Sequence, residues 1–160
     1  MKNLNSLLEI LLKSNIDFVV IGGFAGVVHG ASQVTKDLDI CCLLSLENIE
    51  KLRGILKDLH PKHRMTASPK LSFMDHPQHV MGLNNVYLET DLGVLDVLGQ
   101  VAPIGDFQRI KDSSIEIELL GHKCKVISLE DLIQVKESMT RNKDQTLLLE
   151  LKTILSKLKP

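Results

Sequence analysis

The residues of this chain whose type and spacing could do chemistry begin with two aspartates, Asp37 and Asp39, in the segment DLDICCLL. The segment predicts a strand over residues 37–44, and residues two apart on a strand project from the same face. Two carboxylates about 4 Å apart repel each other by about 1 kcal/mol in water, and by more in a shielded site. A divalent cation reverses that cost because hard cations bind clustered oxygen ligands. The spacing therefore predicts a site for Mg²⁺, with Mn²⁺ as the alternative ion, although such a pair can also line the solvent face of an edge strand.

A third aspartate, Asp96, interrupts the apolar segment GVLDVLG, which predicts a strand over residues 93–99. Such a segment is typical of a strand that is buried on both faces. A lone buried carboxylate is costly unless it is paired, protonated or bound to a metal, whereas an aspartate at a strand end can reach water. If this strand lies beside that of Asp39, the three carboxylates converge. That geometry suits two Mg²⁺ ions that bridge the phosphates of a nucleotide.

A pair of glycines, Gly22 and Gly23, follows the short apolar run 18–21, which predicts a buried strand. A short helix is expected over residues 24–29, so the glycines would form a tight turn at a helix start. Because glycines have no side chain, they let backbone N–H groups approach a phosphate closely. A plain turn explains a Gly-Gly pair equally well, and each of these signals is weak alone. Their conjunction predicts a phosphate site beside the carboxylates.

The elements that must position these residues follow from the spacing of apolar residues. Helices are expected where apolar residues recur every three or four positions, and strands where short apolar runs end at a turn. The expected strands are 18–21, 37–44, 85–90, 93–99, 115–119 and 123–127. The first expected helix carries Leu4, Leu7, Leu8, Leu11 and Leu12, and the last carries Leu147, Leu151, Ile154, Leu155 and Leu158. Between them we expect a short helix over 24–29, a helix capped by Ser45, and a helix that is capped by Ser128 and ends near Met139. This order predicts a single α/β domain over residues 1–160, with a mixed sheet.

Composition narrows the classes of function. The chain has 160 residues, 44% of them hydrophobic and 3% aromatic, with a net charge of −1. Few aromatic side chains are present for base stacking, and the overall charge does not attract nucleic acid. Cys41, Cys42 and Cys124 match neither a disulfide framework nor a zinc site, which favours a reducing cytoplasm. The longest apolar stretch, 18–28, is too short to span a bilayer, so a cytoplasmic protein without a membrane partner is expected.

The segment HPKHRMTASPK, residues 60–70, gathers positive charge between two prolines and predicts a loop. Its basic residues could contact an RNA backbone, but a solvated charged loop is the commoner explanation. No G-x-S-x-G, G-x-G-x-x-G or P-loop pattern occurs in the chain. Nucleophilic serine, dinucleotide-binding and Walker-type interpretations therefore lack support.

Three segments together resemble the nucleotidyltransferase fold of the polymerase-β type: VVIGGFAGVVHG, TKDLDI and GVLDVLG. In that pattern a hydrophobic strand and Gly-Gly or Gly-Ser precede an Asp-x-Asp pair, and a third acidic residue lies on a later strand. The tail VISLEDLIQVKESMTRNKDQTLLLEL is similar to that of small bacterial nucleotidyltransferases related to the AbiEii toxin family. One departure is Gln33, where many relatives carry an arginine, so one phosphate contact is lost. The resemblance covers most of residues 16–155.

The resemblance implies a mixed sheet flanked by helices, with further helices at the C-terminus. It implies three catalytic metal ligands for two Mg²⁺ ions, namely Asp37, Asp39 and Asp96. It also implies a site for the triphosphate of a nucleotide, formed by Gly22, Gly23, Lys136, Arg141 and Lys143. Asp144 would orient one of these cations. A solvated junction between two helices is the alternative interpretation of the basic group.

The implied activity is transfer of a nucleoside monophosphate from an NTP to an acceptor hydroxyl, with loss of pyrophosphate. Asp96 is the candidate to take the proton of the acceptor. The acceptor stays open between a tRNA end, a protein hydroxyl and a small molecule such as an antibiotic. The rival hypothesis is a non-catalytic module that binds a nucleotide or a partner protein, as one half of a toxin–antitoxin pair. Three intact carboxylates favour the enzyme hypothesis, because an active site that had lost its activity would not need them.

Overall fold

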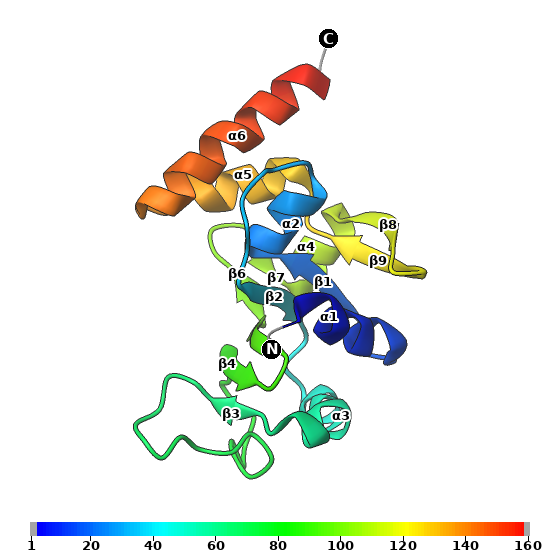
Figure 1. Ribbon diagram of the computed structural model, residues 1–160, viewed down its shortest axis with the longest axis vertical. Coiled ribbons are helices and arrows are strands. Elements are labelled where there is room, and N and C mark those ends of the chain that lie inside the picture. The colour runs from blue at the N-terminus through cyan, green and yellow to red at the C-terminus, as the bar shows by residue number, and fades with distance from the viewer. Residues whose placement is uncertain (1–2, 159–160) are drawn as a thin grey trace.

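A mixed sheet of seven strands runs through the molecule in the order β3-β4-β5-β2-β1-β9-β8 (Figure 1). The computed structural model describes residues 3–158, so residues 1, 2, 159 and 160 of the expected domain lie outside the described part. The strands of this sheet are β1 (Phe18–Ile21), β2 (Asp37–Cys42), β3 (Lys62–His63), β4 (Asn85–Thr90), β5 (Gly93–Leu98), β8 (Ile115–Leu119) and β9 (His122–Val126). Two short strands, β6 (Gln100–Val101) and β7 (Gly105–Asp106), pair separately. The predicted mixed α/β architecture is confirmed.

Helices flank the sheet. They are α1 (Leu4–Lys13), α2 (Gly22–Val28), α3 (Leu46–Leu56), α4 (Phe107–Ser113), α5 (Leu129–Glu137) and α6 (Asn142–Leu158), with a 3₁₀ turn, η1 (Lys57–Leu59), after α3. Helices α1, α3, α4 and α5 begin at residues whose side chains cap them. The side chains of Ser45 and Ser128 accept hydrogen bonds from the backbone N–H three residues on, as predicted. Helices α5 and α6 pack together at one end of the molecule, beside α2, and α3 lies toward the other end (Figure 1).

The register of the central strands decides which residues meet. Strand β2 pairs antiparallel with β1 and parallel with β5. Asp39 therefore lies opposite Ile21 on one side and opposite Asp96 on the other. Because β2 is paired along both edges, the Asp-x-Asp pair does not line an exposed edge strand.

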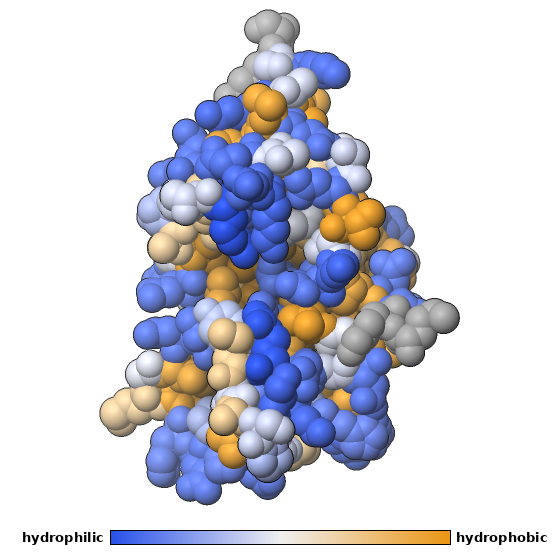
Figure 2. Space-filling model, turned by 60° about the vertical axis from the view of Figure 1, so that its left-hand side comes forward, coloured by the Kyte–Doolittle hydropathy of each residue, from blue (hydrophilic) through white to orange (hydrophobic). Residues whose placement is uncertain are grey.

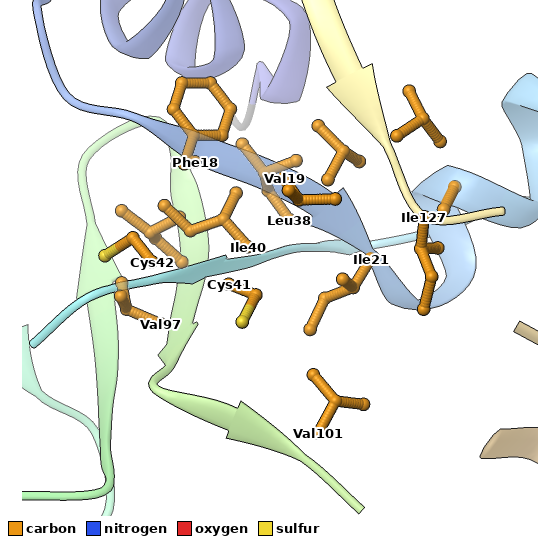
Figure 3. Close-up of a cluster of buried hydrophobic side chains, with 14 of the residues drawn as sticks. Phe18, Val19, Ile21, Leu38, Ile40, Cys41, Cys42, Val97, Val101 and Ile127 are labelled. Atoms are coloured by element: carbon orange, nitrogen blue, oxygen red, sulfur yellow. The ribbon is translucent and has the colours of Figure 1, made fainter. Parts of the chain in front are cut away.

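The pleat of β2 separates its apolar residues from its acidic ones. Leu38 and Ile40 are fully buried, whereas Asp37 and Asp39 project from the other face and are half-buried. Ile40 and Cys41 leave β2 on opposite faces, within a cluster of buried side chains from β1, β2, β5 and β6 (Figure 3). Packing on both faces holds β2 rigidly, which fixes the position of its aspartates.

The structure also corrects the sequence prediction at several elements. Helix α2 begins at Gly22, so the glycine pair forms the first turn of the helix instead of a turn before it. Strand β2 ends at Cys42 and does not continue to residue 44. The strands β3, β6 and β7 and the helix α4 lie in segments where no element was predicted. They have between two and seven residues, which is too short for a clear periodic pattern.

Within residues 3–158, none of the helices combines the length and the apolar character that crossing a bilayer requires. Hydrophilic residues dominate the surface in Figure 2, and hydrophobic atoms are visible in the middle of this face between two mostly hydrophilic regions.

Candidate active site

The three predicted aspartates lie on two neighbouring strands at the centre of the sheet. Asp39 and Asp96 are direct partners in the parallel pair of β2 and β5, and Asp37 lies two residues before Asp39 on the same face. Neighbouring strands are about 4.8 Å apart, so the side chains of Asp39 and Asp96 leave one face of the sheet side by side. The condition set by the sequence, that the strand of Asp96 lies beside that of Asp39, is confirmed.

The backbone of Gly22 lies directly against the Asp39 carboxylate. Gly22 has φ +70°, a left-handed conformation that glycine adopts readily. A Cβ atom at this position would overlap Asp39 Oδ2, so the contact requires glycine. At Gly23 a Cβ would lie 3.4 Å from Thr35 Oγ1, which a small side chain tolerates. The two glycines therefore differ: the first makes room for the carboxylate, and the second lines the adjoining cavity.

Burial and repulsion together keep Asp39 from ionising easily. Burial first, and then the neighbouring charges of Asp96 and Asp37, raise the pKa of Asp39 to about 6, against the attraction of Lys136 and Lys143. A carboxylate in this position gains most from a ligand that brings positive charge. The pKa shift therefore marks the side chain at which a cation stabilises the site most.

A cavity of about 340 Å³ opens beside Asp37 and Asp39 and extends to α5 and α6. Its volume falls in the range of small-molecule sites. Its walls are formed by Gly23, residues 33–37, Asp39, Lys136, Arg141, Lys143, Asp144 and Leu147. Gln33 is part of the wall, and its Nε2 donates to the backbone oxygen of Lys143 at 3.4 Å.

Two of the cations that line this cavity, Lys136 and Arg141, are held by a buried carboxylate. Lys136 Nζ donates to Asp144 Oδ1 at 3.1 Å, and Arg141 Nε donates to Asp144 Oδ2 at 2.6 Å. Burial acts to raise the pKa of Asp144, but the hydrogen bonds from Arg141 and Lys136 outweigh it and hold this pKa below its usual value. Lys136 and Asp144 are only 6% and 1% exposed, whereas Arg141 and Lys143 are exposed, so the interpretation as a solvated helix junction does not apply to Lys136. Asp144 orients two of the predicted cations rather than one, and Lys143 joins them on the wall.

Arg64 holds the third carboxylate. Its Nε donates to Asp96 Oδ1 at 3.1 Å and its Nη2 donates to Asp96 Oδ2 at 2.6 Å. Within residues 3–158, no group of three or more His, Cys, Asp or Glu side chains is arranged so that it could hold a metal ion. The donors of the site are the hard oxygen ligands that Mg²⁺ prefers, but Asp96 is engaged by a guanidinium.

Sequence reasoning missed this arginine because it had grouped Arg64 with the basic residues of the 60–70 loop. That loop is not simply solvated, since Lys70 also pairs with a carboxylate, Glu89, at 2.8 Å. The partner of Arg64 lies 32 residues further along the chain, and no periodic pattern connects them. A buried aspartate with an unassigned countercharge was the available signal.

A second, smaller cavity of about 100 Å³ reaches Asp39 past Gly22. Apolar side chains such as Leu98 and Val101 form much of its wall, and it shares Lys136 and Arg141 with the larger cavity. Asp39 is thus accessible from a charged cavity and from an apolar one. Two different molecules, or two parts of one, can approach the same carboxylate.

Comparison with known proteins identifies the fold. No family model matches the sequence, and no curated protein matches it either. A lincosamide antibiotic adenylyltransferase bound to lincomycin superposes with a TM-score of 0.65 and 20% identity over 94% of this chain and 95% of that one. ANT(2″)-Ia in complex with adenylyl-2″-tobramycin gives a TM-score of 0.60 and 14% identity over 95% of this chain and 89% of that one. A Thermotoga maritima protein described as a putative nucleotidyltransferase superposes with a TM-score of 0.56 and 18% identity over 94% of this chain and 90% of that one. This chain therefore has the nucleotidyltransferase fold.

Proposed function

We propose that this chain is a metal-dependent nucleotidyltransferase that transfers a nucleoside monophosphate from an NTP to a hydroxyl of an acceptor. The observation that carries the proposal is the register of β2 and β5, which sets Asp39 against Asp96, with the Gly22 backbone beside them. The charged cavity at the same carboxylates supports it. A fold shared with enzymes that adenylylate antibiotics supports it further.

The acidic group offers the oxygen ligands that a divalent metal needs, provided that Asp96 is released by Arg64. Asp37, Asp39 and Asp96 would hold Mg²⁺, with Mn²⁺ as a substitute, because carboxylate oxygens are the ligands that these ions prefer. The raised pKa of Asp39 supports this assignment, since a buried carboxylate beside two others is stabilised by added positive charge. When bound, Mg²⁺ neutralises phosphate charge and favours departure of pyrophosphate.

The side chains of the cavity have separate tasks in the proposed reaction. Lys136, Arg141 and Lys143 bind the phosphates, and Gly23 lets them approach the start of α2. Asp96 takes the proton of the acceptor hydroxyl, whose oxygen then bonds to the α-phosphorus. The bond from that phosphorus to the β-phosphate oxygen breaks, and pyrophosphate leaves with the electron pair.

A small hydroxylated molecule is the acceptor class that we favour. The two antibiotic-modifying enzymes match nearly the whole of this chain. The apolar cavity beside Asp39 offers a place for an uncharged part of such a molecule. An RNA end or a protein hydroxyl is the alternative acceptor.

The test is NTP-dependent labelling. Purified protein is incubated with Mg²⁺ and each α-³²P-labelled NTP, and with lincomycin, tobramycin, tRNA or cell extract as the acceptor source. We expect label on a small molecule with wild type and none with Asp39→Asn. Label on tRNA or on a protein would move the assignment of the acceptor to that class of macromolecule. Absence of label with every NTP and every acceptor source would favour the non-catalytic module.

A further inference from the structure

Of the three aspartates, only Asp96 is already engaged by another side chain. Arg64 donates to both of its oxygens, and the two side chains are 27% and 12% exposed. Among the described residues, the carboxylates of Asp37 and Asp39 make no hydrogen bond or ion pair. The two aspartates of β2 can therefore accept a metal as they stand, whereas the aspartate of β5 cannot do so freely.

The contact of Arg64 with Asp96 is built by the sheet and is not a chance meeting of surface charges. The backbone N–H of Arg64 donates to the Tyr87 backbone oxygen at 3.0 Å, which continues the pairing of β3 with β4. Tyr87 is itself the register partner of Asp96. The Arg64 guanidinium carbon lies 5.2 Å from the centroid of the Tyr87 ring. Backbone and ring together aim the guanidinium at the carboxylate.

Occupation of both oxygens has a consequence for metal binding. A two-pronged arginine occupies one lone pair on each carboxylate oxygen and leaves one on each for a metal. A cation brought to Asp96 would also meet the positive charge of Arg64 at close range. An ion that needs Asp96 as a ligand must therefore compete with the guanidinium for this carboxylate.

We propose that Arg64 is a positioning residue that governs when Asp96 becomes a metal ligand. This inference rests on the proposed function. Asp37 and Asp39 would hold a divalent ion that accompanies the nucleotide. An ion that requires Asp96 would bind tightly only once Arg64 had moved away, so Arg64 would set the order in which the site is completed. The same movement frees Asp96 to accept the acceptor proton.

The experiment counts bound Mn²⁺ by electron paramagnetic resonance in the presence of the non-hydrolysable analogue α,β-methylene-ATP. We expect wild type to bind one ion tightly and a second ion weakly. Arg64→Gln should tighten the second ion by about 10- to 100-fold, because it removes a charge-assisted pair of bonds that competes with the metal. Arg64→Lys should tighten it less, since lysine keeps the charge but cannot grip both oxygens.

A matched control is Arg109→Gln. Arg109 also makes a two-pronged contact with a buried carboxylate, Asp131, at 3.1 and 3.3 Å, but outside the walls of both cavities that reach Asp39. This variant should leave Mn²⁺ binding unchanged, and thermal melting verifies that each variant is folded. Equal tight binding of two ions by wild type and Arg64→Gln would overturn the inference and leave the proposed function intact. Failure of every protein to bind Mn²⁺ with the analogue would overturn both.

Discussion

Replacing Asp39 by asparagine should stabilise the metal-free protein. Burial, with repulsion from Asp96 and Asp37, raises the pKa of Asp39 from 3.8 to about 6. Between pH 3.8 and about pH 6, Asp39 is therefore mostly protonated in the folded protein and mostly ionised in the unfolded chain. The contribution of Asp39 to stability is therefore greatest below about pH 3.8 and falls as the pH rises to about 6. A shift of this size corresponds to about 3 kcal/mol of destabilisation at neutral pH.

Asparagine has nearly the shape of the protonated aspartate and carries no charge, so Asp39→Asn should recover most of this free energy. Allowing about 1 kcal/mol for burial of the amide leaves a gain of about 2 kcal/mol. In a domain of this size that corresponds to a rise in melting temperature of about 4–8 °C. The assay is thermal melting of wild type and variant without metal, at pH 7.5 and at pH 4. The rise should be present at pH 7.5 and nearly absent at pH 4, where wild type is protonated as well.

Asp17→Asn provides a control of opposite sign. Burial acts to raise the pKa of Asp17, but hydrogen bonds from Lys111 and Lys125 outweigh it and lower that pKa. A carboxyl with a lowered pKa contributes stability above its unfolded pKa and loses it as the pH falls, so Asp17→Asn should lower the melting temperature at pH 7.5. A lower melting temperature for Asp39→Asn at pH 7.5, or a difference that does not depend on pH, would refute the reasoning.

Three further substitutions separate folding from binding. Gly22→Ala should lower the melting temperature and abolish nucleotide binding, since its Cβ would overlap the Asp39 carboxylate; unchanged calorimetric binding would contradict this. Gly23→Val should fold, because its Cβ has room, yet block the approach of the phosphates, and calorimetry with Mg²⁺ and ATP or CTP checks this. Lys136→Ala should weaken nucleotide binding by about 10- to 100-fold, and transfer should recover partly at high NTP. Transfer that stays low at saturating NTP would assign Lys136 a different role.

From the sequence, the pairing of β2 with β5 could be stated only as the condition under which the three aspartates converge, and a conflict within the sequence points to it. Asp96 stands in a segment that is otherwise apolar, and its neighbours Leu95 and Val97 are fully buried. A charge in such a strand needs a neighbouring polar group, a ligand or a countercharge, and Asp39, on another apolar strand, is the candidate neighbour. The register that the structure shows, with Asp39 directly opposite Asp96, satisfies that need only through a ligand or a countercharge.

The countercharge itself could not be predicted. Arg64 lies just beyond a strand of two residues, in a segment with prolines, and its position depends on the β3–β4 pairing. Contacts of this kind depend on tertiary structure and cannot be predicted from the local spacing of apolar residues. The same limit applies to Asp144, whose position after Arg141 and Lys143 was visible in the sequence, but whose burial beneath Lys136 was not.

The distribution of cations over the buried acids is itself an argument for the function. Asp144 has two cations at hydrogen-bond distance and a lowered pKa, and Asp96 has the guanidinium of Arg64. Asp39 has none at such a distance and a raised pKa, although Lys136 is near enough to act on it. A sheet selected only for stability would not keep an unpaired carboxylate against two others at its centre. We expect the metal-bound triphosphate to enter beside Asp39, the carboxylate that has no cation at hydrogen-bond distance.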